Sequence, residues 1–329
     1  MKNSITICQE GKVVHSSALD CVKSNPHKPP STFMAVRKDT IWERFLSPIV
    51  RSLIDEEKLR QLYESIDWQA ESDRLSNPQV IYPDYYSSQN FHGIEGGYLN
   101  PGASVTYDAI TQYVLPPNET WVRQGLIEHI GGTPRRILDL GCGTGSTTLM
   151  LKQAFLQAQV IGLDLSPYML VMAEHKAKTA ELTIEWRHGK AEQTGFPDAS
   201  FDLVTVSLLF HETPPAVAKA ILRESFRLLI PGGEVLVLDG NQKTLRQVDW
   251  LTQVFEEPYI KDYATESVEA GMGAAGFEAV QTYDHWWIHQ VTRGIKPIRA
   301  NNPAAAAQQA FTRNTPQDFG SQGTPAPAF

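Results

Sequence analysis

The sequence predicts an α/β protein whose core is a mostly parallel sheet. Strand and helix patterns alternate from Arg136 onward, which is typical of parallel strands joined by helices. A buried strand pattern from Ile137 to Leu140 leads into the glycine turn 141–145, and a helical pattern over Thr147 to Leu156 follows. Such a turn brings backbone N–H groups close to a bound ligand. These observations predict an α/β domain that binds a ligand at the glycine turn.

Length and composition restrict the class of protein. The chain has 329 residues, of which 42% are hydrophobic and 20% charged, enough for one large domain with a packed core and additions. The formal net charge of −8 argues against a general nucleic-acid-binding surface, which needs a basic face. No nucleic-acid partner is therefore expected, and the oligomeric state stays open.

Cysteine usage and apolar runs bear on the setting of the protein. The three cysteines, Cys8, Cys21 and Cys142, lack metal-ligand spacing, so no metal site is expected and a reducing, cytoplasmic setting fits them best. The N-terminal stretch carries no pattern of a secretory signal. The longest apolar stretch, Phe201 to Phe210, is too short to span a bilayer. We therefore expect no integral membrane segment.

The region before the sheet is predicted to form a helical and aromatic cap. Residues 1–38 show little pattern and several prolines, which predicts a poorly ordered leader. Within the cap, residues 39–130, apolar residues recur at helical spacing from Thr40 to Ile66, and Pro48 divides or kinks this helix. The segment from Asn77 to Tyr113 crowds aromatic residues among Gly, Pro and Asn. It is either an irregular layer packed on the core or an acceptor pocket.

The remaining elements fall within residues 131–299, the predicted ligand-binding domain. The cap is expected to end with a helix from Trp121 to Ile130. Further helices are expected to begin at Pro167 after the second strand, to run from Thr213 to about Leu229 after the fourth strand, and to run from Thr265 to Ala275 before the last two strands. Strands after the first are expected at Gln159 to Asp164, Thr183 to His188, Phe201 to Ser207, Glu234 to Asp239, Phe277 to Tyr283 and Trp286 to Thr292. Residues 300–329 are rich in Ala, Gln, Pro and Gly, which predicts a disordered tail.

The glycine spacing and two acidic residues near the glycine turn indicate which kind of ligand the turn binds. The spacing is Gly-x-Gly-x-Gly, whereas a dinucleotide fingerprint would need glycine at Ser146. Asp139 precedes the turn, and a carboxylate there suits a cationic ligand better than a pyrophosphate. Asp164 ends the second strand, 19 residues after Gly145, where nucleoside-binding α/β folds place the acid that accepts hydrogen bonds from ribose hydroxyls.

From Arg136 to Pro297 the chain resembles the class I S-adenosylmethionine-dependent methyltransferases. The matching motifs begin with the cofactor loop Asp139 to Gly145, the ribose-binding acid Asp164 and the turn Gly189 to Glu192 after the third strand. They continue with Phe201 to Val204 of the fourth strand, the turn Leu228 to Gly233 before the fifth strand and the entry to the sixth strand at Ala275 to Phe277. The runs His211-Glu212-Thr213-Pro214 and Glu257-Pro258-Tyr259 are similar to a plant and cyanobacterial branch of the ubiquinone/menaquinone-type methyltransferases.

The resemblance implies a Rossmann-like sheet of seven strands, the last antiparallel, with helices on both faces. It also implies S-adenosyl-L-methionine as cofactor, with the methionine part near the glycine turn, the ribose at Asp164 and the adenine near Ala191 and Glu192. The residues expected to bind the cofactor are Asp139, Gly141, Cys142, Gly143, Gly145, Asp164, Leu165, Ala191, Glu192 and Ser207. Many relatives have Asp where this chain has Lys190, and lysine cannot accept a hydrogen bond from adenine. Adenine recognition is therefore expected to depend on the Ala191 backbone, Glu192 and packing.

Catalytic and acceptor-binding residues are expected after the fourth strand and in the aromatic segment. His211 lies where the strands end and is either a general base or a support that orients Glu212. His92 is a second catalytic candidate, and Tyr85, Phe91 and Tyr98 are the candidates for binding the acceptor. We expect Tyr85, Phe91 or His92 to reach the cavity that holds His211 and the sulfonium. A separate cluster, His285, Trp286, Trp287 and His289, is expected to pack in the core along the last strand.

The predicted function is methyl transfer to an O, C or N nucleophile of a small, apolar or aromatic molecule. The protein would mainly supply proximity and orientation, because the cofactor is already activated. A non-catalytic protein that binds S-adenosylmethionine stays open, since binding and turnover need different residues. A nicotinamide or flavin oxidoreductase is disfavoured by the glycine spacing and by Asp139. A nucleotide hydrolase is disfavoured because no Gly-Lys-Ser/Thr ends the turn.

Overall fold

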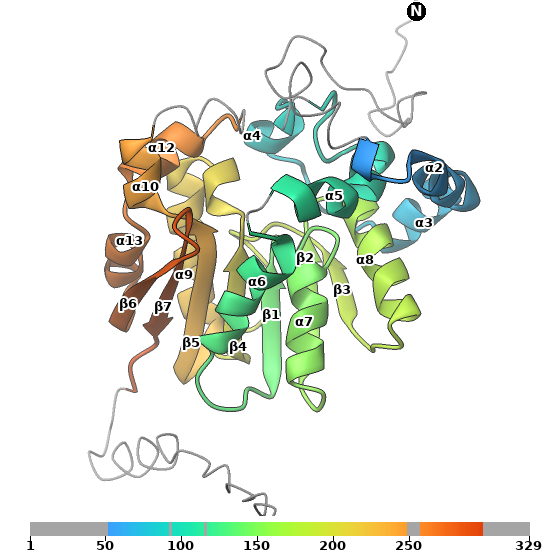
Figure 1. The fold of residues 1–329 in the computed structure, drawn as a ribbon. Coiled ribbons are helices and arrows are strands. Elements are labelled where there is room, and N and C mark those ends of the chain that lie inside the picture. The colour runs from blue at the N-terminus through green and yellow to red at the C-terminus, as the bar shows by residue number, and fades with distance from the viewer. Residues whose placement is uncertain (1–51, 92–93, 115–116, 249–256, 299–329) are drawn as a thin grey trace, which may run out of the picture.

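A seven-stranded sheet forms the centre of the molecule (Figure 1). The computed structural model describes residues 52–91, 94–114, 117–248 and 257–298. The strands lie in the order β3-β2-β1-β4-β5-β7-β6. Their bounds are β1 Arg136–Leu140, β2 Gln159–Asp164, β3 Glu185–His188, β4 Phe201–Ser207, β5 Leu229–Gly240, β6 Glu278–His285 and β7 His289–Ile295.

Strand directions confirm the predicted sheet. β1 to β5 pair in parallel, while β7 runs antiparallel to both β5 and β6. From β1 the chain first builds outward to β2 and β3, and then crosses to β4 on the other side of β1. Open α/β sheets bind ligands at the strand ends where the order reverses in this way. The topology therefore places a binding crevice at the ends of β1 and β4.

Helices cover both faces of the sheet. Their bounds are α2 Glu56–Ser65, α3 Trp68–Leu75, α4 Asp84–Ser87, α5 Pro101–Val114, α6 Glu119–Glu128, α7 Ser146–Ala154, α8 Pro167–Thr179, α9 Pro215–Leu228, α10 Gln242–Gln247, α12 Ile260–Thr265 and α13 Val268–Ala275, with the 3-10 helix η3 at Phe210–Glu212. Alternate residues of each central strand are buried on opposite faces. Ile137 belongs to a buried cluster with side chains of α6 and α7, whereas Leu138 belongs to another buried cluster, which includes side chains of α9 and α13.

Local sequence explains how α8 begins. The Ser166 side chain accepts from the Met169 backbone N–H at 3.2 Å, and Pro167 occupies the first helical position. Both features are those expected of a helix start. The Ser166 hydroxyl also donates to the Tyr98 carbonyl at 2.7 Å, so the residue that starts α8 also fastens the cap to the sheet domain.

The cap helices lie over the carboxyl ends of the strands. Figure 1 shows α4 and α5 above the ends of β1 and β2, with α2 and α3 beside α8. Trp68 of α3 packs edge-on against Tyr168 of α8, with ring centroids 6.3 Å apart. The predicted leader, residues 1–38, and tail, residues 300–329, lie outside the described residues. Within the part of the chain that the structure describes, no helix is long and apolar enough to cross a membrane.

Two elements differ from the sequence-based predictions. The segment from Asn77 to Tyr113 is not irregular throughout, because it contains α4 and most of α5. The prediction that Trp286 and Trp287 pack in the core along the last strand is wrong. Both lie in the turn between β6 and β7 with positive φ, and they are 47% and 64% exposed. Aromatic residues favour strands, but here the strand begins only at His289.

A tight contact under the glycine turn generates a stability prediction. A Cβ at Gly162, in the middle of β2, would lie 2.5 Å from Cζ3 of Trp186 and 3.0 Å from Sγ of Cys142. We expect Gly162→Ala to lower the free energy of unfolding by about 1–3 kcal/mol through overpacking. Gly273→Ala is the matched control, because a Cβ there meets nothing within 4 Å, and alanine should stabilise that helix by up to about 1 kcal/mol. Urea unfolding measures both, and an unchanged stability of Gly162→Ala would contradict the packing described.

Candidate functional site

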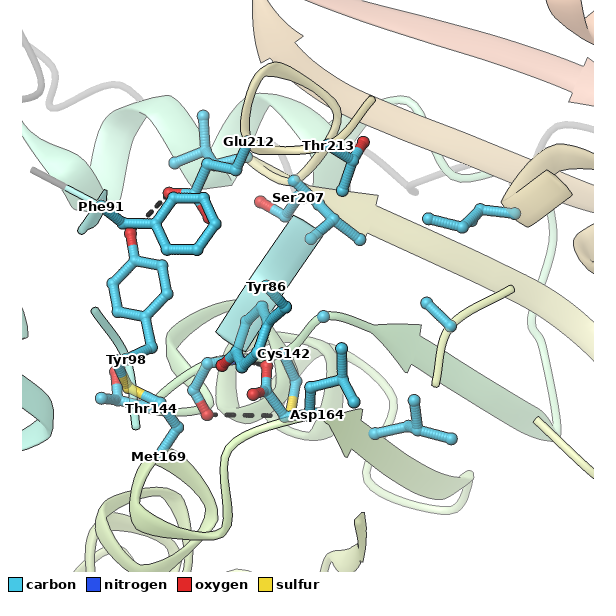
Figure 2. A pocket seen from close by; sticks show the side chains of 18 of the residues that line it. Tyr86, Phe91, Tyr98, Cys142, Thr144, Asp164, Met169, Ser207, Glu212 and Thr213 are labelled. Carbon is cyan, nitrogen blue, oxygen red and sulfur yellow. Dashed lines mark hydrogen bonds between the residues drawn. The ribbon is translucent and has the colours of Figure 1, made fainter. Parts of the chain in front are cut away.

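A cavity of about 790 Å³, including its open mouth, lies where the strand ends meet the cap. Figure 2 shows its lining side chains converging from the glycine turn, the strand ends and the aromatic segment. The predicted site residues that line it are Tyr85, Phe91, Tyr98, Gly141, Cys142, Gly143, Asp164, Leu165, Ala191 and Ser207. The structure thus brings together most of the residues that the sequence assigns to cofactor and acceptor.

The glycine turn has different constraints at its three glycines. Gly141, Gly143 and Gly145 have φ of 65°, 52° and 78°, which glycine adopts without strain. A Cβ at Gly143 would meet nothing within 4 Å, so this backbone faces open space. A Cβ at Gly145 would lie 2.7 Å from the Trp186 ring, and Gly145 does not line the cavity. The missing side chain of Gly143 therefore leaves space for a ligand, whereas that of Gly145 leaves space for the Trp186 ring.

Asp164 holds the turn from the end of β2. Its two carboxylate oxygens accept the backbone N–H groups of Gly143 and Ser166, each at 2.8 Å. Burial raises the pKa of Asp164 to about 6, although these hydrogen bonds oppose the rise. Asp164 is thus a buried acceptor at the cavity wall, as a ribose-binding acid must be.

Asp139 lies behind the turn and does not line the cavity. Its oxygens accept from the hydroxyl groups of Thr148 at 2.6 Å and Thr205 at 2.8 Å. The carboxyl is almost fully buried, and burial raises its pKa even though both hydroxyl groups oppose the change. In this structure Asp139 ties α7 and β4 to the end of β1.

A surface network fixes the outer side of the turn. Asp108 of α5 accepts from the hydroxyl groups of Thr144 at 2.6 Å and Ser146 at 3.1 Å. Lys176 of α8 donates to Asp108 at 2.7 Å and to Ser146 at 2.9 Å. The cap helix α5 is therefore joined directly to the residues that shape the glycine turn.

The side assigned to adenine is only partly formed by the predicted residues. Leu165 and Ala191 line the cavity together with Gly189. Glu192 is not among the lining residues, and the Tyr85 hydroxyl lies 3.4 Å from each of its carboxylate oxygens. The structure thus leaves apolar and backbone surface at this side of the cavity.

Aromatic side chains of the cap form the opposite wall. Phe91 and Tyr98 stack with ring centroids 5.2 Å apart and planes 7° apart, and Tyr107 meets Tyr98 edge-on at 6.0 Å. Tyr86 adjoins Phe91 at 5.8 Å. Such rings supply large, rigid contact area. His92, the second catalytic candidate, lies outside the described residues.

The turn after β4 presents Glu212, and not His211, to the cavity. The hydroxyl of Tyr98 donates to Oε1 of Glu212 at 2.5 Å, a bond drawn in Figure 2. His211 instead pairs through Nδ1 with the fully buried Asp239 at 2.6 Å. Of the two roles that the sequence allows for His211, this geometry favours support of Glu212.

Arg123 is the one Lys, Arg or His among the described residues that line the cavity. Its guanidinium donates to Glu119 at 2.8 Å and to the hydroxyl of Thr147 at 2.7 Å. Burial lowers the pKa of Arg123, but Glu119, Tyr107 and Asp108 together outweigh burial, and the pKa is raised. Sequence reasoning missed this residue, because a lone arginine inside a helical pattern carries no signal of its own.

The buried Arg123–Glu119 pair generates a second stability prediction. Removing one partner of a buried ion pair leaves an uncompensated charge, so Glu119→Ala should lower the free energy of unfolding by about 3–5 kcal/mol. Glu266→Ala, which removes the partner of Lys219 in an exposed pair at 2.9 Å, should cost less than about 1 kcal/mol. Chemical denaturation of the two variants side by side checks this, and equal losses would contradict the special cost of the buried pair.

Comparisons with known proteins agree with the fold and the motifs. Residues 137–233 match the family described as methyltransferase domain. The demethylmenaquinone methyltransferases of Deinococcus radiodurans and Thermus thermophilus are 34% and 38% identical over 134 and 119 residues, which are 40% and 36% of this chain. The aligned parts are 55% and 53% of those proteins, so the chain spans about half the length of the curated relatives it matches.

Solved structures add a likeness of fold. Phosphoethanolamine N-methyltransferase 2 of Haemonchus contortus, in complex with S-adenosyl-L-methionine, aligns with a TM-score of 0.50 at 15% identity. The alignment covers 68% of this chain and 62% of that one. Residues 137–233 therefore match the methyltransferase domain family, and the chain is similar to demethylmenaquinone methyltransferases over part of its length.

Proposed function

We propose that the chain is an S-adenosylmethionine-dependent methyltransferase that acts on a small, apolar or aromatic molecule. The observation that carries the proposal is the continuity of one cavity. It joins the open glycine turn and Asp164 at one end to the aromatic wall and Glu212 at the other. A methyl donor and an acceptor have to meet in such a space, with one held by the turn and the other by the cap.

The cofactor end follows from the hydrogen-bonding groups of the wall. Asp164 suits the ribose hydroxyls, because an ionised carboxylate accepts hydrogen bonds and donates none. Gly143 leaves its backbone open to the methionine part. Arg123 suits the carboxylate of that part, since a guanidinium forms strong, charge-assisted hydrogen bonds with carboxylates. This assignment gives Arg123 the direct contact and leaves Asp139 to shape the turn.

The acceptor end is assigned to Tyr85, Phe91 and Tyr98, with Glu212 between them and the strand ends. These residues supply flat apolar walls and one carboxylate, so a flat molecule with a single polar edge fits them best. The bound cofactor supplies an activated methyl group. The chain's own contribution is to orient the acceptor and to exclude water.

Calorimetry against a cofactor panel tests the class of protein. S-adenosylhomocysteine should bind, and nicotinamide and flavin dinucleotides should not. Formation of S-adenosylhomocysteine from the methyl donor, in the presence of small aromatic acceptors, then separates an enzyme from a non-catalytic binding protein. Binding of a dinucleotide in place of S-adenosylhomocysteine would overturn the proposal. The cytoplasmic setting and the absence of a nucleic-acid partner remain predictions from composition.

Asp164 generates a prediction on cofactor affinity. Asp164→Ala should weaken binding of S-adenosylhomocysteine about 10- to 150-fold, because hydrogen bonds to a charged group contribute about 1.5–3 kcal/mol. Asp202→Ala is the matched control. Asp202 also accepts two backbone N–H groups, those of Arg135 and Arg136, but at the opposite end of the sheet. Unchanged affinity in a folded Asp164→Ala protein would remove the ribose assignment.

The raised pKa of Asp164 generates a prediction on pH. The carboxyl is protonated below its pKa of about 6 in the unliganded protein, and the protonated form accepts hydrogen bonds less well. Affinity for S-adenosylhomocysteine should therefore be constant above pH 7 and fall by up to about tenfold per pH unit below 6. In Asp164→Asn this fall should be absent. Titrations at several pH values measure it, and the same fall in both proteins would assign it to another group.

A further inference from the structure

The carboxylate of Glu212 is held at the cavity wall by polar groups around it. Glu212 belongs to η3, directly after β4, and its side chain is 11% exposed. Tyr98 donates to Oε1 from the cap side, and Nε2 of His211 lies 3.9 Å from the same oxygen on the other side. A hydrogen bond from the cap thus fixes one oxygen of this carboxylate, and the imidazole of His211 lies close to it.

His211 is itself held by a buried acid. Asp239 accepts from Nδ1 of His211 at 2.6 Å and from the backbone N–H groups of Phe210 and Gly240 at 2.8 and 2.7 Å. Burial lowers the pKa of His211, but the charge and hydrogen bond of Asp239, together with the charges of Glu212 and Glu257, outweigh burial and raise the pKa to about 9. An imidazolium at this position places a positive charge 3.9 Å from Oε1 of Glu212. Burial, reinforced by Glu212, raises the pKa of Tyr98 well above its usual value, so Tyr98 stays a donor.

A carboxylate close to the methyl donor would by itself slow methyl transfer, so its presence in this cavity calls for a chemical explanation. A sulfonium loses its positive charge when it gives up a methyl group, so a fixed negative charge nearby stabilises the starting state more than the transition state. This cost disappears if the carboxylate is neutralised in the same reaction by a proton from the acceptor. Both charges then vanish together, which a buried, low-dielectric site favours.

We infer that Glu212 is the catalytic residue that takes the proton of the acceptor, and that the acceptor is a neutral aromatic molecule with a weakly acidic hydroxyl group beside its ring. This inference rests on the proposed function and adds the acceptor class and the proton's destination. The stacked Phe91 and Tyr98 rings receive the acceptor ring, and Glu212 receives its O–H. His211 and Asp239 act through Glu212 and are positioning residues.

The reaction balances with these groups alone. The acceptor O–H bond breaks and its proton moves to a carboxylate oxygen of Glu212. The freed electron pair of the oxygen forms the new O–CH₃ bond, while the pair of the broken C–S bond stays on sulfur. The products are a methyl ether, a neutral thioether and protonated Glu212, which releases its proton to water when the product leaves.

The main alternative is that Glu212 only holds Tyr98 and the cap in place. A matched pair of probes separates the two roles without turnover: 4-nitrophenol, which has a hydroxyl group, and 4-nitroanisole, in which a methyl ether replaces it. Both are titrated onto the full chain saturated with S-adenosylhomocysteine, as wild type, Glu212→Gln and the surface control Glu266→Gln. The absorbance of the nitrophenol reports whether the bound form is the phenol or the phenolate.

If the inference holds, Glu212→Gln weakens 4-nitrophenol binding about tenfold, the difference between a charged and a neutral hydrogen-bond acceptor. It leaves 4-nitroanisole binding and S-adenosylhomocysteine affinity within about twofold. The wild type should favour the neutral phenol, because a carboxylate repels a phenolate, and Glu212→Gln should lose this preference. Transfer to phenols should fall about 10²- to 10⁴-fold in kcat, with KM for the methyl donor unchanged.

Three results would contradict this assignment at different levels. If Glu212→Gln weakens the binding of both probes equally, or weakens the binding of neither, Glu212 has only a structural role and the inference is overturned. No binding of either probe to the S-adenosylhomocysteine complex overturns the aromatic hydroxyl class. Failure of S-adenosylhomocysteine to bind the wild type overturns the proposed function itself, so the two failures are distinct.

Discussion

The site depends first on the two hydrogen bonds that Asp164 accepts. One carboxylate at the end of β2 joins the glycine turn after β1 to the start of α8, through the N–H groups of Gly143 and Ser166. Burying this carboxyl is unfavourable, as its raised pKa shows. The two bonds offset that cost only while the turn and the helix keep their positions. The strand ends, the turn and α8 therefore form one rigid unit before any ligand binds.

The cap is built onto this unit by residues that also shape the cavity. Asp108 bonds the side chains of the glycine turn, Ser166 donates to the Tyr98 carbonyl, and the Tyr98 hydroxyl reaches Glu212. Each contact joins a residue of the cap to one that shapes or lines the site. Movement of the cap would thus change the turn and the acceptor wall together. The aromatic segment is both a packing layer and a cavity wall, and its binding of an acceptor stays a prediction.

The sheet could be predicted from sequence because its signals are local. Buried runs such as Gln159 to Asp164 and the Ser166-Pro167 helix start determine their own structure with little help from elsewhere. Trp286 and Trp287 could not be placed in this way, since strand propensity does not reveal a turn of positive φ. The site follows the same division. Asp164 is found by its spacing from the glycines, whereas Arg123 and Glu212 reach the cavity only because the fold brings segments distant in sequence together.

The charges of the cavity connect these observations. Arg123 is neutralised by Glu119, which leaves Asp164 and Glu212 as the two acids at the opposite ends of the wall. An acidic, aromatic cavity attracts a cation and disfavours an anion. It therefore suits a sulfonium and opposes the pyrophosphate of a dinucleotide, the same distinction that Asp139 suggested from the sequence. In the folded protein Asp139 is turned to Thr148 and Thr205, so under the proposed function the selecting charge is that of Glu212, which the turn after β4 brings to the cavity.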